Sequence, residues 1–98
     1  MEPLTEEAIA EALESLAGWA HRGDTLAKEF VFADFRQAMG FVVRVGFEAE
    51  ALNHHPELFN VYNKVTLCLS THDAGGKVTQ KDVDLATAIS ALHGAAGE

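Results

Sequence analysis

The stretch that decides the fold class spans residues 58–71 and reads LFNVYNKVTLCLST. It is rich in β-branched and aromatic side chains, and it divides into two extended runs, 58–61 and 64–71. Tyr62-Asn63 lies between the runs as a candidate tight turn, because Asn tolerates a positive φ. The pattern predicts a β-hairpin. We expect Val65, Leu67 and Leu69 to face the core, and Lys64, Thr66, Cys68, Ser70 and His72 to face the other way.

A long helix is predicted immediately before this hairpin. Asp34 followed by Gln37 resembles a capping box, and Pro56 disfavours helical geometry at the preceding residue, so the helix ends as His54 and His55 arrive. Helical spacing places one apolar stripe along nearly five turns. The stripe comprises Phe35, Ala38, Met39, Val42, Gly46, Ala49 and Leu52.

The other side of the same helix is also apolar, with Phe41, Val43, Val45 and Phe47 outside the stripe. A helix that is hydrophobic nearly all round is usually buried. In a domain this thin, the second face predicts a contact between subunits.

The flanking segments complete the element order. Thr5 is a candidate N-cap for a helix over residues 6–17, and residues 19–32 form a predicted hairpin around Arg22-Gly23-Asp24. Thr79 and Asp82 cap a last helix. Its inner face comprises Val83, Leu85, Ala86, Ile89 and Leu92. The order α-β-β-α-β-β-α predicts a single α+β domain over residues 1–98, a four-stranded antiparallel sheet with three helices packed on one face.

The chain has 98 residues and a net charge of -8, from 15 acidic and 7 basic side chains. That balance argues against binding to nucleic acid or to anionic membranes. The single cysteine, Cys68, excludes an intramolecular disulfide, and no apolar run is long enough for a signal sequence or a membrane span. We expect a soluble cytoplasmic protein.

Three histidines are candidates for acid-base chemistry: His54 and His55 at the end of the long helix, and His72 at the end of a strand. Imidazole exchanges protons near neutral pH, and sites are often built where elements end. Glu50 lies four residues before His54 on the same helical face, where it could orient an imidazole or hold its charge. The alternative is that each histidine is an ordinary surface residue and that Glu50 is simply solvated.

A metal centre is not predicted, because neighbouring side chains on a helix diverge by about 100° and no other ligand lies at short spacing. Cys68 and Ser70 lack the glycine-rich turn of a nucleophile elbow, and Gly75-Gly76 lacks the lysine of a phosphate loop. Of the remaining histidines, His21 is a predicted surface residue. His93 lies near the end of the last helix, where positive charge is favourable.

Three segments together closely resemble the pterin-4a-carbinolamine dehydratases. They are residues 50–57 (EALNHHPE), 60–65 (NVYNKV) and 70–86, which begins STHDAGG and includes Thr79, Asp82 and Leu85-Ala86. The resemblance reaches upstream to Gly18-Trp19 and to residues 30–35, so it covers about residues 13–93. It departs from the family at Asn53, which is often Asp, at Leu58, which is usually Trp, and at Lys77, which reads as an insertion.

The resemblance implies an enzyme that dehydrates 4a-hydroxytetrahydropterin to quinonoid dihydropterin and water, in recycling of the cofactor of aromatic amino-acid hydroxylases. It implies that no metal or cofactor takes part. The implied catalytic residues are His54, His55, His72 and Glu50, with His54 and His72 as the main acid-base pair. The implied substrate-binding residues are Asn53, His54, His55, Ser70, Thr71, His72 and Asp73.

The family also forms homodimers and homotetramers through sheet edges and the long helix, which implies the same for this chain. Some animal relatives act as dimerisation cofactors of a transcription factor. The alternative function is therefore a non-catalytic binding module that acts as a transcriptional cofactor.

Overall fold

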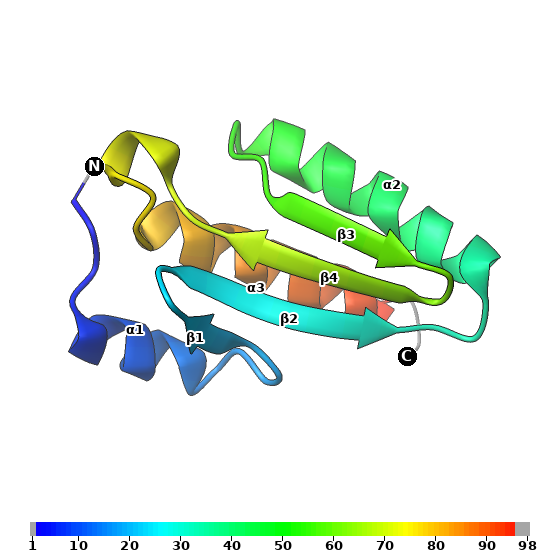
Figure 1. Ribbon diagram of the computed structural model, residues 1–98, viewed down its shortest axis with the longest axis horizontal. Helices are drawn as coiled ribbons and strands as arrows, with labels where there is room; N and C mark the ends of the chain where they lie inside the picture. The colour runs from blue at the N-terminus through cyan, green and yellow to red at the C-terminus, as the bar shows by residue number, and fades with distance from the viewer. Residues whose placement is uncertain (1, 96–98) are drawn as a thin grey trace.

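The computed structural model describes residues 2–95 and places three α-helices on one face of a four-stranded antiparallel sheet (Figure 1). In chain order the elements are α1 (Glu6–Leu13), β1 (Ala20–Arg22), β2 (Thr25–Val31), α2 (Phe35–Ala51), β3 (Glu57–Val61), β4 (Lys64–Leu69), the 3₁₀ turn η1 (His72–Ala74) and α3 (Gln80–Ala95). The predicted fold class and element order are confirmed. The strand order is β1-β2-β4-β3, so β3 forms one edge of the sheet.

The sheet joins the two predicted hairpins through antiparallel pairing of β2 with β4. Leu26 lies opposite Leu69 and Phe30 lies opposite Val65, so these side chains share the helix-covered face. The buried residues of β4 are Val65, Leu67 and Leu69, as predicted. The alternation of apolar and polar side chains along β4 thus correctly predicts which face of that strand is covered by the helices.

The turn between β3 and β4 differs from the prediction in one detail. Tyr62, not Asn63, has the positive φ, at 51°. Asn63 is used differently: its Nδ2 donates to the carbonyl of Phe32 at 2.9 Å, and its own carbonyl accepts from the Phe32 N–H at 2.8 Å. Asn60 Nδ2 donates to the Lys64 carbonyl at 2.9 Å. These bonds compensate for the unusual backbone at Tyr62.

Helix α1 is shorter than predicted. Thr5 Oγ1 accepts from the Ala8 N–H at 3.1 Å, which confirms the N-cap, but the helix ends at Leu13 rather than at residue 17. The chain then turns so that Leu16 and Trp19 enter the core. Gly18 lies in this turn at φ 85°, where an added Cβ would meet Lys28 at 2.8 Å.

Helix α2 begins as predicted, with Asp34 Oδ1 accepting from the Gln37 N–H at 2.8 Å. The predicted inner stripe is partly wrong. The buried residues are Ala38, Phe41, Val45 and Ala49, whereas Phe35 and Leu52 are exposed. Because both sides of the helix are apolar, periodicity alone could not choose between them. Tertiary packing selects the buried side, because the Phe41 ring contacts Phe30 with 4.8 Å between the ring centroids.

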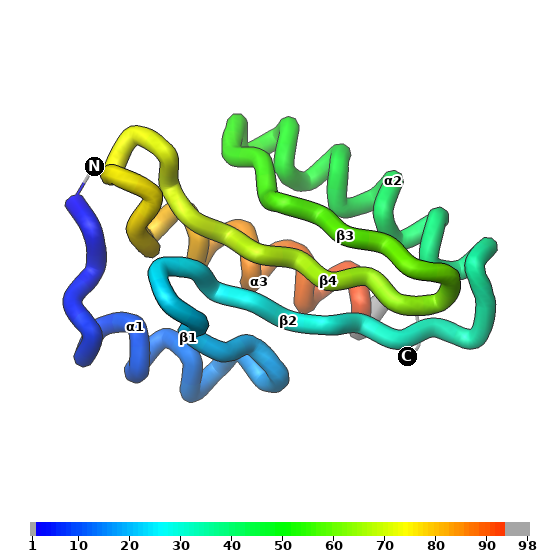
Figure 2. The backbone as a smooth tube through the Cα atoms, viewed as in Figure 1, coloured from blue at the N-terminus to red at the C-terminus, as the bar shows by residue number. Residues whose placement is uncertain are grey.

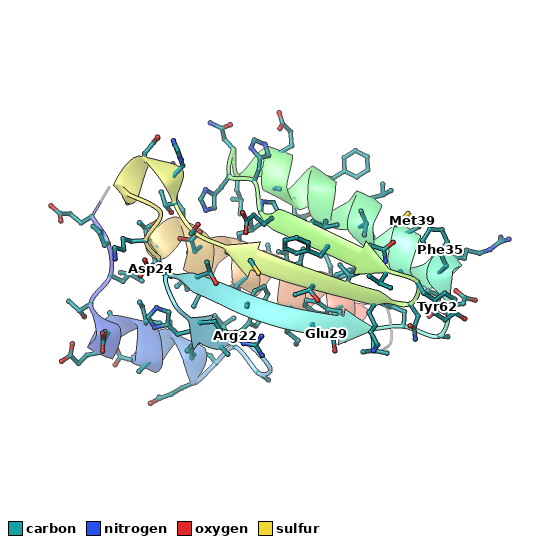
Figure 3. All side chains as sticks on the ribbon, viewed as in Figure 1. Arg22, Asp24, Glu29, Phe35, Met39 and Tyr62 are labelled. Atoms are coloured by element: carbon teal, nitrogen blue, oxygen red, sulfur yellow. The ribbon has the colours of Figure 1, made fainter. Side chains whose placement is uncertain are left out.

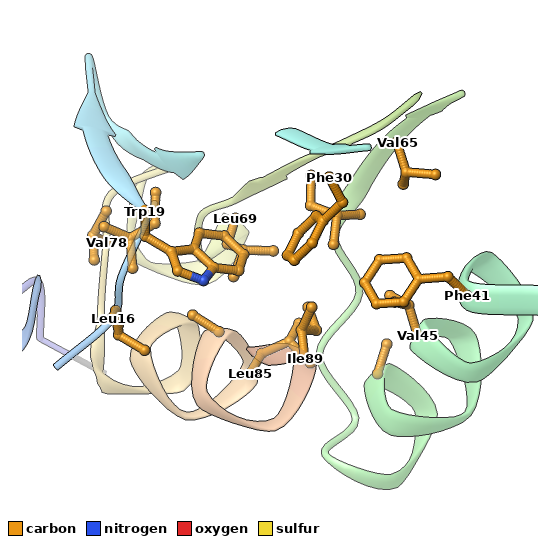
Figure 4. Packing of buried hydrophobic residues seen from close by; sticks show 14 of the residues in the cluster. Leu16, Trp19, Phe30, Phe41, Val45, Val65, Leu69, Val78, Leu85 and Ile89 are labelled. Carbon is orange, nitrogen blue, oxygen red and sulfur yellow. The ribbon is translucent and has the colours of Figure 1, made fainter. Parts of the chain in front are cut away.

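A single hydrophobic cluster fills the space between the sheet and the helices (Figure 4). His93 packs against this cluster at the end of α3. Its ring centroid lies 4.9 Å from Phe30, 5.7 Å from Phe32 and 6.0 Å from Phe41. Its Nε2 is buried and has no hydrogen-bond partner among the described residues. His93 is thus an aromatic packing residue rather than a solvated surface residue.

The backbone path brings the N-terminal segment to the turn that follows β4 (Figure 2). The N–H of Leu4 donates to the carbonyl of Val78 at 2.8 Å, directly before the start of α3. Lys77 Nζ lies 3.2 Å from Asp24 Oδ1, which ties the same turn to the β1–β2 hairpin. The segment between β4 and α3 is therefore held by contacts with both the N-terminal segment and the β1–β2 hairpin.

Candidate active site

The predicted site residues come from two segments, one after α2 and one after β4. Helix α2 ends at Ala51, and Asn53 then takes a left-handed conformation at φ 52°, which Asn adopts more readily than most residues. The N–H of His54 donates back to the Ala49 carbonyl at 2.9 Å. Because the chain leaves the helix before the histidines, His54 and His55 lie in different environments.

His54 is buried and pairs with a buried carboxylate. Its Nε2 lies 2.5 Å from Oδ1 of Asp82, a residue of the first turn of α3 with no exposed surface. An ionised carboxylate only accepts hydrogen bonds, so with Asp82 ionised the hydrogen of this contact lies on Nε2, and Nδ1 lies outside the contact. The pairing fixes the orientation of the imidazole.

The second oxygen of Asp82 is also fully used. Oδ2 accepts from Thr71 Oγ1 at 2.9 Å and from the Thr79 N–H at 2.8 Å. The two threonine hydroxyls lie 2.6 Å apart, and both residues are buried. Three donors therefore converge on one carboxylate, which offsets the cost of burying it.

Glu50 contacts an imidazole, but the expectation that it shares a helical face with His54 is wrong. Its Oε1 lies 3.0 Å from Nε2 of His55 instead. The side chains of His55 and Glu50 are 61% and 79% exposed, so solvent screens this pair. The helix ends before residue 54, and the i, i+4 geometry assumed for Glu50 and His54 does not exist.

His72 follows β4 as predicted and begins η1, where it is exposed. Asp73 is also exposed and Ser70 is half-buried. Gly75 and Gly76 close the turn at φ 74° and 78°, and the Gly76 N–H donates to the Thr71 carbonyl at 3.0 Å. The backbone carbonyl of Thr71 thus stabilises the turn, and its hydroxyl donates to Asp82. Thr71 therefore connects the turn that bears His72 to the His54–Asp82 pair.

Asp82 is the site residue that the sequence argument missed. The sequence predicts it only as a helix cap, a role it does have through its bond to the Thr79 N–H. The contact with His54 joins residues 28 positions apart, and a local pattern cannot show such a contact. One feature of the sequence points to a role for Asp82 in the site: it follows the loop that carries the STHDAGG motif, at the start of an apolar helix.

Other chemistries find less support in the geometry. No group of three or more His, Cys, Asp or Glu side chains within residues 2–95 is arranged to hold a metal ion. Burial raises the pKa of the Cys68 thiol, the Glu57 carboxylate adds to the increase and Arg22 opposes it, so the thiolate form is disfavoured. Hollows of about 200 and 180 Å³ lie elsewhere, the first lined by Arg22, Lys28 and Glu29 and the second by His21, Asp24 and Lys77.

None of the helices within residues 2–95 is long and apolar enough to cross a membrane. The described site consists of one buried imidazole, His54, which a carboxylate holds, and two exposed imidazoles. His55 is adjacent to His54 in the sequence, and His72 follows Thr71, which bonds to the same carboxylate. Imidazole is a side chain that can both donate and accept a proton.

Comparison with known proteins agrees with this description. The sequence profile of the family described as "Pterin 4 alpha carbinolamine dehydratase" matches residues 2–92. A protein of Opitutus terrae named "Putative pterin-4-alpha-carbinolamine dehydratase" is 60% identical over 85% of this chain and 86% of its own length. A protein of the same name from Rhodopseudomonas palustris is 48% identical over 99% of this chain and 97% of its own length.

A solved structure shows the same fold. The crystal structure of the transcriptional coactivator/pterin dehydratase from Brucella melitensis superposes with a TM-score of 0.87 at 39% identity, and covers 92% of this chain and 97% of the other. The family profile spans nearly the whole chain, including every histidine of the site. The chain belongs to the pterin-4-alpha-carbinolamine dehydratase family.

Proposed function

We propose that this protein is a 4a-hydroxytetrahydropterin dehydratase that works by histidine acid-base catalysis. The observation that carries the proposal is the buried His54–Asp82 pair, linked through Thr71 to the turn that bears His72. A buried imidazole with one nitrogen fixed by a carboxylate is suited to proton transfer at its other nitrogen. The family supplies the substrate class.

The reaction needs two proton movements. One proton is added to the C4a hydroxyl, which then leaves as water, and one proton is removed from N5. The electron pair released at N5 forms the new double bond to C4a, so the products are quinonoid dihydropterin and water. We assign these two transfers to His54 and His72, without deciding which of them acts as the acid. His55 binds and polarises the substrate, and Glu50 orients His55.

The remaining predicted residues are neighbours in sequence of the three histidines. Asn53 lies in the turn that presents both histidines, and Ser70 and Asp73 flank Thr71 and His72. We assign them to substrate contact. Thr71 contributes through Asp82, because its buried hydroxyl is committed to that carboxylate.

The direct test is the decay of synthetic 4a-hydroxytetrahydropterin, followed by absorbance as quinonoid dihydropterin forms. The wild-type chain should accelerate decay well above the buffer rate, and His54→Ala and His72→Ala should abolish most of the acceleration. Lys64→Ala is a matched control, because it lies in the same hairpin far along the strand from His72. Equal rates with and without the wild-type protein would refute the proposal.

We further place the protein in the cytoplasm as a homo-oligomer that recycles the cofactor of an aromatic amino-acid hydroxylase. Support for self-association comes from α2, where Val43 is exposed and Phe47 is 70% exposed although both are large and apolar. Light scattering at micromolar concentration should give a mass of at least two chains. A strictly monomeric mass would exclude the oligomer.

The second candidate function is a non-catalytic module that binds a transcription factor. It draws on the name of the Brucella protein, which combines a coactivator with a pterin dehydratase, and on the same exposed face of α2. Retention of His54, His55 and His72 favours the enzyme. The dehydration assay separates the two candidates, since a pure binding module leaves the decay rate unchanged.

A further inference from the structure

Thr79 is a buried polar residue whose hydroxyl the proposed mechanism does not use. It directly precedes α3, and it has no exposed surface. A buried hydroxyl is costly unless it forms hydrogen bonds, so its partners indicate what it does. Its Oγ1 accepts from the Lys81 N–H at 3.2 Å, as a helix cap does, and lies 2.6 Å from Oγ1 of Thr71. The hydroxyl of Thr79 therefore has a second contact in addition to its role as a cap.

The direction of the hydrogen bond between the two hydroxyls follows from the acceptor at the end of the chain. Each threonine hydroxyl has one hydrogen to donate. The hydrogen of Thr71 goes to Oδ2 of Asp82 at 2.9 Å, because an ionised carboxylate only accepts. The hydrogen in the 2.6 Å contact must then come from Thr79. The result is a directed chain of hydrogen bonds that starts at the Lys81 N–H and ends at the carboxylate.

The two oxygens of Asp82 thereby have different roles. Oδ2 accepts from two donors, the Thr71 hydroxyl and the Thr79 N–H. Among the described residues Oδ1 contacts only Nε2 of His54. A hydrogen shared by the buried pair therefore lies between Oδ1 and Nε2. Thr79 contributes to both bonds at Oδ2, directly through its N–H and indirectly through its hydroxyl.

The charge of Asp82 is balanced without a lysine or an arginine. Within residues 2–95 its only ion-pair partner is His54. A fixed cation would compete with the imidazole for the carboxylate, whereas hydroxyl and amide donors stabilise the negative charge without neutralising it. In a buried chain of hydrogen bonds, each bond polarises the next. The donation from the Thr79 hydroxyl therefore affects the bond between Asp82 and His54.

The backbone holds the two hydroxyls in place. The N–H of Thr71 donates to the Lys77 carbonyl at 2.9 Å in an antiparallel bridge, and Val78 is buried in the core. Lys77 also pairs with Asp24, which Figure 3 shows at the tip of the β1–β2 hairpin. Thr71 and Thr79 are thus held at both ends of one short, anchored segment.

Resting on the proposed function, we propose that Thr79 is a positioning residue of the dehydration reaction. Its hydroxyl acts through Thr71 on Asp82, because hydrogen bonds donated to a carboxylate favour the ionised form. The ionised carboxylate in turn keeps the hydrogen of the buried pair on Nε2 of His54 and holds the ring in one orientation. Thr79 has no exposed surface, so it acts on the chemistry without touching the substrate.

The first test compares variants that differ in one hydroxyl. Thr79→Val keeps the branched shape and removes the hydroxyl, whereas Thr79→Ser keeps the hydroxyl. Thr79→Val should lower kcat about threefold to tenfold, the net contribution of one hydrogen bond, with KM unchanged. Thr79→Ser should retain the wild-type kcat. If Thr79→Val does not fold, Thr79→Cys replaces it, because a thiol is only a weak donor. Wild-type kcat in the variant without the hydroxyl, or an equal loss in Thr79→Ser, would overturn the proposal.

Thr5→Val is the matched control for the loss of a helix cap. Thr5 Oγ1 accepts from the Ala8 N–H at 3.1 Å at the start of α1. Within residues 2–95 it forms no hydrogen bond with Thr71, Thr79 or Asp82. Thr5→Val should therefore leave kcat unchanged. A loss of kcat as large as that in Thr79→Val would assign the effect to capping and overturn the proposal.

The second test observes the hydrogen of the buried pair directly. In protein labelled with ¹⁵N-histidine, the Nε2–H signal of His54 is identified by nuclear magnetic resonance from its absence in His54→Gln. The signal should have the same chemical shift in the wild type, in Thr79→Ser and in Thr5→Val, and it should move in Thr79→Val. An unmoved signal in Thr79→Val would overturn the proposal.

The two tests separate this inference from the proposed function. A wild-type chain without dehydration activity overturns the function, and the His54 signal then still decides whether Thr79 acts on the imidazole. An active wild-type chain whose kcat and His54 signal are both unchanged by Thr79→Val keeps the function and overturns the positioning role.

Discussion

The neighbouring residues His54 and His55 each pair with a carboxylate, and the two pairs differ in almost everything else. His54 meets Asp82 at 2.5 Å inside the protein, and His55 meets Glu50 at 3.0 Å on its surface. Their chemical groups are the same, so environment alone separates them. A pair out of water holds its geometry and is costly to break, whereas a solvated pair is screened and weak. The comparison indicates that the buried pair fixes the orientation of its imidazole and that the exposed pair does so only weakly.

Removing Asp82 should break the buried pair most severely. Asp82→Ala leaves His54, Thr71 and the Thr79 N–H without their shared acceptor, and breaking a buried pair typically costs about 3–5 kcal/mol of folding stability. Urea unfolding of the variant and the wild type measures this cost. Asp82→Asn is the milder version, which keeps volume but loses the charge. A loss below about 1 kcal/mol for Asp82→Ala would contradict the importance of burial.

His54→Ala and His72→Ala should each lower the dehydration rate by about 10²–10⁴-fold, as is usual for a lost acid-base group. The double variant should lose less than the product of the two single losses if the groups act as one unit. Glutamine at either position retains much of the hydrogen bonding without proton transfer and so separates binding from chemistry. Near wild-type rates for both folded alanine variants would remove the catalytic assignment.

His93 is a histidine outside the site, and its replacement tests whether loss of a packed imidazole affects stability without affecting the rate. His93→Ala removes a ring that contacts three phenylalanines, so it should lower the stability by about 1–3 kcal/mol while the rate per folded molecule stays unchanged. His21→Ala is the exposed control and should stay within about 0.5 kcal/mol of the wild type. A large rate loss in folded His93→Ala would instead connect the aromatic cluster to catalysis.

Glu50→Gln tests the exposed pair. Because both partners are largely solvated, the expected change in stability is within about 1 kcal/mol, and the rate should change far less than in Asp82→Asn. The measurement is the same pair of assays on both variants. Equal rate losses in Glu50→Gln and Asp82→Asn would show that exposure does not rank the two pairs.

The smallest expected effect is that of a chelator. Prolonged dialysis against EDTA should leave the dehydration rate unchanged, since the proposed chemistry uses imidazoles alone. Activity that is lost on dialysis and restored by zinc would reverse this assignment.

The sequence was most informative where neighbours along the chain determine structure. Strand alternation at Val65, Leu67 and Leu69, and the caps at Thr5, Asp34 and Thr79, are local properties and were predictable. The buried face of α2 was not, because Phe41 and Val45 compete with an equally apolar opposite stripe that only the tertiary packing distinguishes. Asp82 was hidden for a similar reason, since its partner His54 is distant in the chain.

The double use of Asp82 also has a dynamic consequence. Helix ends open by local unfolding more readily than helix middles do. Here the first turn of α3 is secured by the carboxylate that holds His54, so fraying of that turn and release of the imidazole are one event. The protection of the Thr79 amide against hydrogen exchange therefore reports the fraction of molecules whose site is assembled.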